Sequence, residues 1–202
     1  MSHHLLFWPA SAAALTVLHL MGPPVPPLEA QRHREDQRSA ERHRVLELYD
    51  RVTDSSRVVA TIAATSRRFG LGSRVAVDVS YTYPGRHLTV SPEWVVITME
   101  SFTPARGGWA FARPRPLEVR SGGALKLQVP PAEYRKQRVR PFDAGRREML
   151  SFRVSPAEFL MLVSETELSL EVGGASIRLM GRRMEALRAL AERLKPVVEA
   201  GR

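Results

Sequence analysis

Hydrophobic and polar residues alternate with a period of two in the middle of the chain. Over residues 74–83 every odd position is Val or Tyr, and the even positions are Arg, Ala, Asp, Ser and Thr. Because successive side chains of a strand point to opposite faces, this pattern predicts a half-buried antiparallel strand. Residues 58–64 and 94–99 are apolar at odd and even positions alike, which is typical of central strands.

Shorter strands are expected between turn signals along the rest of the chain. Runs of 168–172 and 175–179 alternate on either side of Gly173-Gly174, and this arrangement predicts a tight hairpin because glycine readily adopts positive φ angles. The short, even spacing of the strands predicts a mainly β (α+β) fold, an antiparallel β-sandwich or open barrel of about eight strands. The remaining strand candidates are residues 109–111, 117–120, 124–129, 137–139 and 148–154.

Two segments of the last third have helical patterns. Ser155 offers a capping hydroxyl, Pro156 occupies the first helical position and Glu158 lies three residues after the cap, which predicts a short helix over 155–163. Residues 182–199 carry a single apolar stripe. This stripe predicts a C-terminal amphipathic helix packed on the sheet.

A polar arm precedes the β-rich part of the chain. Residues 31–44 mix Arg, His, Glu and Asp, and an apolar stripe with helical spacing follows at Val45, Leu48, Tyr49 and Val52. The stripe predicts a short helix, although an extended segment leading into the first strand fits the same residues. The predicted organisation is an arm with a short helix over 31–56 and one globular domain over 57–202.

The first thirty residues have the pattern of a cleavable signal peptide. The apolar run over 5–21 is shorter than the roughly 20 residues that span a bilayer core, and Pro9 and His19 interrupt it. Four prolines follow, and we expect cleavage between Ala30 and Gln31 because a small residue fits the peptidase pocket. No Lys or Arg precedes the run, which departs from the usual pattern.

The signal peptide predicts a periplasmic or secreted protein. An uncleaved signal anchor that tethers the chain to the membrane is the first alternative. A frayed or buried N-terminal helix of a cytoplasmic protein is the second. Cysteine is absent from the chain, which excludes lipoprotein acylation, disulfides and thiolate chemistry.

The chain is strongly basic, with 30 Lys and Arg against 21 Asp and Glu and a formal net charge of +9 at pH 7. Residues 1–30 hold one acidic residue and no Lys or Arg, so their removal raises the net charge to +10. Such a charge favours anionic lipid, polysaccharide or nucleic acid as a partner. Only three of the basic residues are Lys, and the coding bias of a GC-rich genome also produces such an excess of Arg.

Histidine is scarce in the predicted domain. Five of the six histidines lie in the leader or the polar arm, which leaves His87. A serine triad would need His87, but no Gly-x-Ser-x-Gly elbow occurs, and zinc takes three or four N, S or O ligands. We therefore expect no catalytic residue, no metal site and no cofactor.

Paired carboxylates would support a different chemistry, the hydrolysis of glycosidic bonds. Five glutamates lie at predicted strand edges, where solvated surface positions are the commoner role, and no pair among them is marked by the sequence. These are Glu93, Glu100, Glu118, Glu148 and Glu167.

A basic cluster surrounds the predicted strand 137–139. If Arg138 and Arg140 flank Val139 on that strand, their guanidinium groups share one face and can bind phosphate or carboxylate bidentately. Trp109, beside two glycines, is the aromatic residue expected to be most exposed, and it could stack on a sugar or a base. The alternative is a solvated hairpin in an Arg-rich protein. The candidate binding residues are Arg135, Lys136, Arg138, Arg140, Arg146, Arg147 and Trp109.

These observations predict a non-enzymatic binding or envelope-associated module. The order of elements over its second half resembles that of many exported bacterial proteins, and this resemblance assigns no role to any residue. Expected partners are an anionic envelope component, lipid or polysaccharide, or another protein. An envelope hydrolase with a carboxylate pair is one alternative, and a cytoplasmic nucleic-acid-binding protein is the other if no leader is present.

Overall fold

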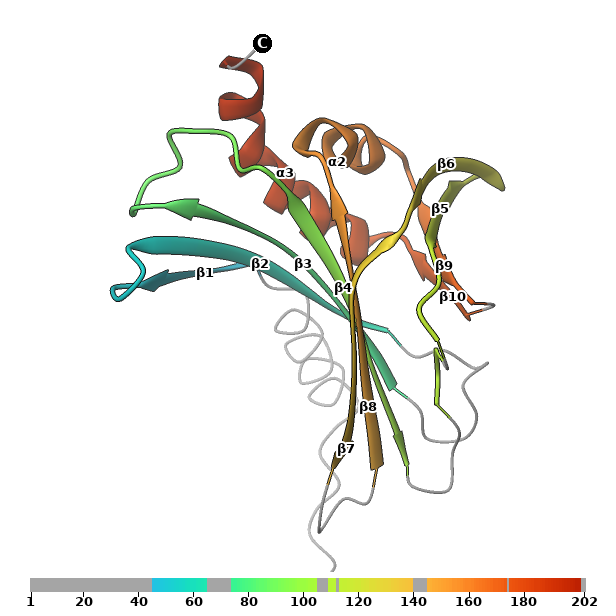
Figure 1. Ribbon diagram of the computed structural model, residues 1–202. Helices are drawn as coiled ribbons and strands as arrows, with labels where there is room; N and C mark the ends of the chain where they lie inside the picture. The colour runs from blue at the N-terminus through green and yellow to red at the C-terminus, as the bar shows by residue number, and fades with distance from the viewer. Residues whose placement is uncertain are drawn as a thin grey trace, which may run out of the picture.

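The computed structural model describes residues 45–64, 74–104, 109–111, 113–139, 145–173 and 175–200. Within these ranges, ten strands form two open antiparallel sheets, and two helices lie beside them (Figure 1). The mainly β architecture with a C-terminal helix is therefore confirmed. The leader over 1–30 and the arm over 31–44 lie outside the described residues.

The larger sheet has six strands, which curve strongly across the molecule in Figure 1. Every neighbouring pair in it is antiparallel. In spatial order the strands are β1 (Val45–Asp50), β2 (Ser55–Ala64), β3 (Arg74–Pro84), β4 (Val95–Pro104), β8 (Gly145–Val154) and β7 (Pro131–Val139).

The smaller sheet has four strands and contains the glycine hairpin. In spatial order they are β10 (Ala175–Leu179), β9 (Leu168–Val172), β5 (Leu117–Ser121) and β6 (Ala124–Val129). Gly173 has a φ of 58° at the turn between β9 and β10, the left-handed conformation that the hairpin prediction required. The hairpin is therefore confirmed.

One face of the larger sheet forms the main core. On β3 the odd positions from Val75 to Tyr83 are buried, as the alternation predicted. Helix α3 (Arg182–Ala200) lies against β1 and β2 on this face. Its buried stripe includes Met184, Leu187, Leu190, Leu194 and Val198.

Helix α2 (Pro156–Val163) packs against α3 and has the predicted capping box. The Glu158 N–H donates to the Ser155 hydroxyl, and the Ser155 N–H donates to the Glu158 carboxylate, 2.8 Å away. At the other end of α2, Arg188 of α3 donates to the carbonyls of Val163 and Glu165. Both ends of this short helix are thus hydrogen-bonded to side chains.

The helix expected at Val45, Leu48, Tyr49 and Val52 is wrong, because Val45–Asp50 is strand β1. All six of its residues pair with β2 in register. The edge of β2 offers these residues backbone partners that a helix of six to eight residues could not match, so the extended alternative holds. Since β1 belongs to the larger sheet, the β-rich part of the chain begins by Val45 and not at residue 57.

Two strand predictions in the middle of the chain also need correction. The described residues from Trp109 to Phe111 form no strand, and the Phe111 N–H donates to a side chain, the Glu148 carboxylate. The expected strand at 137–139 is the end of β7, whose nine residues start at Pro131. Its pairing with β8 shifts register between Pro131 and Glu133, so no simple alternation marks the whole strand.

The capping box predicts a stability change. We expect Ser155→Ala to lower the free energy of unfolding by about 1 kcal/mol, because the Glu158 N–H loses its acceptor. Ser155→Thr keeps a hydroxyl and is expected to stay within about 0.5 kcal/mol of the parent. Urea denaturation measures both variants, and equal losses in the two would contradict the assigned role of the hydroxyl.

Candidate binding sites

The register of β7 and β8 divides the predicted basic cluster between the two faces of the larger sheet. Cross-strand partners share a face, and Tyr134 pairs with Leu150, Lys136 with Glu148 and Arg138 with Arg146. Because Leu150 is in the core, these residues lie on the core side of the sheet, here called the inner face. The alternate positions lie on the outer face.

The two cations of the predicted cluster on the outer face form ion pairs with neighbouring acids. Arg135 forms an ion pair with Glu133 on the same strand, and Arg147 forms one with Glu100 of β4. Glu100 and the two arginines line one shallow pocket with Gln137 and Met149. Each of these two cluster residues is therefore paired with an acid, while Arg153 of β8 is a further, exposed cation on the outer face.

Among the described residues of β7 and β8, the inner face carries three cations and one acid. Arg138 and Arg146 lie directly opposite each other, and Lys136 pairs with Glu148. Like charges in directly opposed positions destabilise a strand pair. We call Lys136, Arg138, Arg146 and Trp109 the inner basic patch, which has a net excess of positive charge.

Aromatic rings hold two of the cations of the inner basic patch. The Lys136 ammonium lies 5.1 Å from the ring centroids of both Trp109 and Tyr134, and the Arg146 guanidinium lies 5.4 Å from that of Trp109. These distances are within the range of cation–π attraction. The structure therefore brings Trp109 to the basic residues, as a shared binding surface requires, although Trp109 lies on the segment between β4 and β5.

The carboxylate of Glu148 anchors the inner basic patch. Its side chain is 1% exposed and accepts hydrogen bonds from the Tyr134 hydroxyl at 2.8 Å and the Phe111 N–H at 3.0 Å. Burial and this hydrogen bond to Glu148 raise the pKa of Tyr134. One buried acid thus fixes both rings next to Lys136, because Phe111 is two residues from Trp109.

One predicted site residue, Arg140, lies outside the described residues. Its expected partner on the strand, Arg138, lies opposite Arg146. The other five cations are distributed three to the inner face and two to the outer face. The sequence identified the cluster, but not this division.

A second site forms at the opposite end of the larger sheet. The inner basic patch lies at the end of the sheet where Arg146 pairs with Thr103 of β4 and where the neighbouring Phe102 pairs with Arg74, the first residue of β3. Tyr83 lies at the other end of β3. A cleft of about 410 Å³ opens there between β1, β3 and α3. It is lined by Glu47, Val58, Tyr81, Tyr83, Arg86, His87, Leu88 and Arg193.

Glu47 is the centre of the polar contacts in this cleft. Its carboxylate accepts a hydrogen bond from the Tyr83 hydroxyl at 2.5 Å and one from Arg193 at 2.9 Å. Tyr81 is 1% exposed, and no atom of the described residues accepts a hydrogen bond from its hydroxyl. Burial raises the pKa of Tyr81 to about 12, and the nearby charge of Arg193 opposes this shift.

The sequence did not reveal this cleft, because its residues come from three distant segments. Glu47 falls within the expected helix, His87 follows a Pro-Gly pair and Arg193 is on the polar side of the C-terminal helix. Only the spacing of Tyr81 and Tyr83, two residues apart on one face, was a usable signal.

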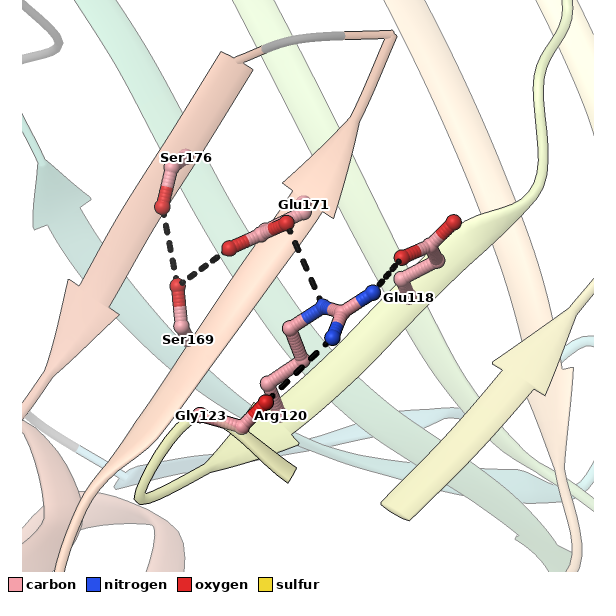
Figure 2. A network of polar contacts seen from close by, with 6 residues as sticks. All are labelled: Glu118, Arg120, Gly123, Ser169, Glu171 and Ser176. Atoms are coloured by element: carbon pink, nitrogen blue, oxygen red, sulfur yellow. Dashed lines mark hydrogen bonds and ion pairs between the residues drawn. The ribbon is translucent and has the colours of Figure 1, made fainter. Parts of the chain in front are cut away.

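A third polar cluster, on the small sheet, has its charges paired internally. Figure 2 shows Arg120 between Glu118 and Glu171, with which it forms ion pairs. Its guanidinium donates hydrogen bonds to the Glu118 carboxylate at 2.6 Å and to the Gly123 carbonyl at 3.3 Å. Glu118 and Glu171 face each other across β5 and β9. The hydrogen bond that Arg120 donates to Glu118 raises the pKa of Arg120. We assign this cluster to the stability of the small sheet.

The carboxylates considered for hydrolysis do not converge as a pair. Within the described ranges, Glu100, Glu118 and Glu167 form ion pairs with arginine, and Glu148 has the two donors given above. Glu93 is exposed. Among the same residues, His, Asp and Glu form no group of three or more that could hold a metal ion.

Neither α2 nor α3 combines the length and hydropathy that a membrane-spanning helix requires. Comparisons with protein-family models, curated proteins and solved structures found no match for this chain.

The role of Glu148 leads to a prediction for Tyr134. We expect Tyr134→Phe to lower the free energy of unfolding by about 1–3 kcal/mol, because a buried carboxylate loses one of its donors. Tyr49→Phe removes an exposed hydroxyl that donates to Asp54, and we expect it to cost no more than about 0.5 kcal/mol. Chemical denaturation distinguishes the two, and a loss below 0.5 kcal/mol for Tyr134→Phe would refute the anchoring role.

Proposed function

We propose that this protein is exported and is a non-enzymatic module that binds an anionic polysaccharide of the cell envelope through the inner basic patch. The observation that carries the proposal is the division of charge by the β7–β8 register. On the outer face Arg135 and Arg147 form ion pairs with glutamates, and on the inner face the described residues of β7 and β8 comprise three cations and one buried acid.

The chemistry of the patch fits sugars that carry carboxylate or phosphate groups. Guanidinium groups bind such groups bidentately, and the opposed pair Arg138 and Arg146 gains from an anion placed between them. Trp109 is half-buried beside these cations. An aromatic ring next to a cation offers both an apolar surface and charge to a sugar chain.

A polysaccharide fits the surroundings of the patch better than a lipid bilayer does. Membrane-surface binding combines basic residues with exposed apolar side chains that enter the interface. Among the described residues, the large exposed hydrophobic side chains lie outside β7 and β8, and include Leu48, Val52, Val90 and Met161. The patch therefore favours an electrostatic ligand that does not require insertion.

Export is supported by the leader pattern of residues 1–30. The surrounding envelope would then supply polyanions at high local concentration to a protein of net charge +10.

Export predicts the mass of the native protein. We expect the protein from a fractionated native host to lack residues 1–30, to begin at Gln31 and to occur in the periplasmic or secreted fraction. Intact-mass spectrometry of each fraction measures this. Recovery of the chain with Met1 from the cytosol would refute export, and recovery of the full chain from membranes would indicate an uncleaved anchor.

Because the cations lie on two faces of the sheet, we expect Arg138→Gln on the inner face and Arg135→Gln on the outer face to change ligand affinity differently. We expect Arg138→Gln to weaken binding to polygalacturonate at least fivefold and to reduce the dependence of binding on salt. Arg135→Gln removes the same charge from the outer face, and its affinity is expected to stay within twofold. Because Arg138 faces Arg146, Arg138→Gln should also raise the free energy of unfolding by a few tenths of a kcal/mol.

Titration calorimetry at two salt concentrations measures these affinities, with uncharged dextran as the control ligand. Equal weakening by Arg138→Gln and Arg135→Gln would show that net charge alone governs binding and would contradict a localised site. Tighter binding to duplex DNA than to polygalacturonate, together with a cytosolic location, would instead favour a nucleic-acid-binding protein.

A further inference from the structure

The cleft at Glu47 contains a buried hydrogen-bond donor without an acceptor. The carboxylate of Glu47 accepts one hydrogen bond at each oxygen, from Tyr83 at Oε1 and from Arg193 at Oε2. Tyr81 has a buried hydroxyl that no described atom accepts from. Since a buried donor without an acceptor is costly, a water molecule or a ligand is expected to accept from this hydroxyl.

The charges around the cleft favour an anion. Arg86 and Arg193 bring two positive charges, and Glu47 brings one negative charge. The Arg86 guanidinium is held 4.6 Å from the ring centroid of Tyr49. The cleft thus presents an excess of cations beside an unpaired hydroxyl donor, and an acceptor-rich ligand would complement both.

The wall that carries Arg86, His87 and Leu88 is fixed by the turn before it. Buried Ser56 donates to the Gly85 carbonyl at 2.7 Å, and the Gly85 N–H donates to the Asp54 carbonyl at 2.8 Å. Gly85 has a φ of 71°, which favours glycine at this position. Tyr83 on the opposite wall is fixed by its bond to Glu47. The two walls are therefore in place before any ligand arrives, which lowers the entropic cost of binding, and only the packing around the buried Tyr81 hydroxyl has to open.

The volume and lining of the cleft limit the ligand. About 410 Å³ lies within the range of pockets that hold small organic molecules. Val58 and Leu88, together with the tyrosine rings, offer apolar contact surface. A ligand of matching chemistry has one anionic group for the donors and a small apolar body.

We infer that the cleft between β1, β3 and α3 binds a small organic anion, a carboxylate or a phosphate monoester, whose anionic group accepts a hydrogen bond from Tyr81 and faces Arg86 and Arg193. Because the Tyr81 hydroxyl is shielded from bulk water, this hydrogen bond is stronger than the same contact on the surface. The site is separate from the inner basic patch, which lies at the other end of the sheet.

Three probes of similar size test the inference by titration calorimetry of the protein at neutral pH and low salt. These are benzoate, phenyl phosphate and uncharged benzyl alcohol. We expect at least one of the two anions to bind tenfold more tightly than benzyl alcohol, and the better anion identifies the head group. No detectable binding of either anion, or equal binding of benzyl alcohol, overturns the inference.

Tyr81→Phe removes only the hydroxyl and is the decisive variant. Because this hydroxyl has no partner among the described residues, we expect the thermal midpoint to stay the same or rise, while affinity for the preferred anion falls at least tenfold. Tyr134→Phe removes a hydroxyl at the far end of the sheet and should leave that affinity within twofold. Affinity within twofold of the parent for Tyr81→Phe overturns the inference.

A second variant covers the case in which Tyr81→Phe does not fold. Arg86 is exposed on the loop after Gly85, and Arg86→Gln is expected to weaken anion binding at least fivefold without loss of folding. Arg138→Gln, which tests the polysaccharide surface, should not change binding of the small anion. The two proposals can thus fail independently. Unchanged affinity for Arg86→Gln contradicts the cleft assignment.

Discussion

The register of β8 with β4 and β7 is the constraint on which the described arrangement depends. A shift of one residue exchanges the two faces of a strand. In β8 such a shift would bring Arg147 to the buried position of Glu148 and would turn Leu150 and Phe152 away from the core. The cost of burying an unpaired cation and exposing two large apolar side chains fixes the register, and with it the face on which each cation lies.

Glu148 shows how this constraint reaches beyond the sheet. A buried carboxylate is stable only if donors surround it. Its donors are the Tyr134 hydroxyl on β7 and the Phe111 N–H on the segment between β4 and β5. Backbone pairing already holds β7 beside β8, but the segment of Phe111 is linked to β8 by this one acid. Trp109 lies on the same segment, close to Lys136 and Arg146.

Elements defined by local sequence could be predicted, whereas those defined by distant partners could not. The strand at 74–83, the capping box at Ser155 and the hairpin at Gly173 depend on neighbours in the sequence. Strand β1 exists because β2 offers an edge, and its spacing fits a helix equally well. Likewise the composition revealed the basic cluster, but its division into faces required the pairing of β7 with β8. The cleft joins β1, β3 and α3, which no local pattern connects.

The polar clusters of the molecule differ in one respect that bears on function. In the network of the small sheet, Arg120 and the two glutamates satisfy one another, so a ligand would have to break existing contacts (Figure 2). At the cleft, each oxygen of Glu47 already has a donor, and Tyr81 retains an unused donor. A ligand that accepts from Tyr81 adds a hydrogen bond without removing one. Binding energy is therefore available at the cleft, where the fold leaves a polar group without a partner, and not at the network of the small sheet, where the charged side chains already satisfy one another.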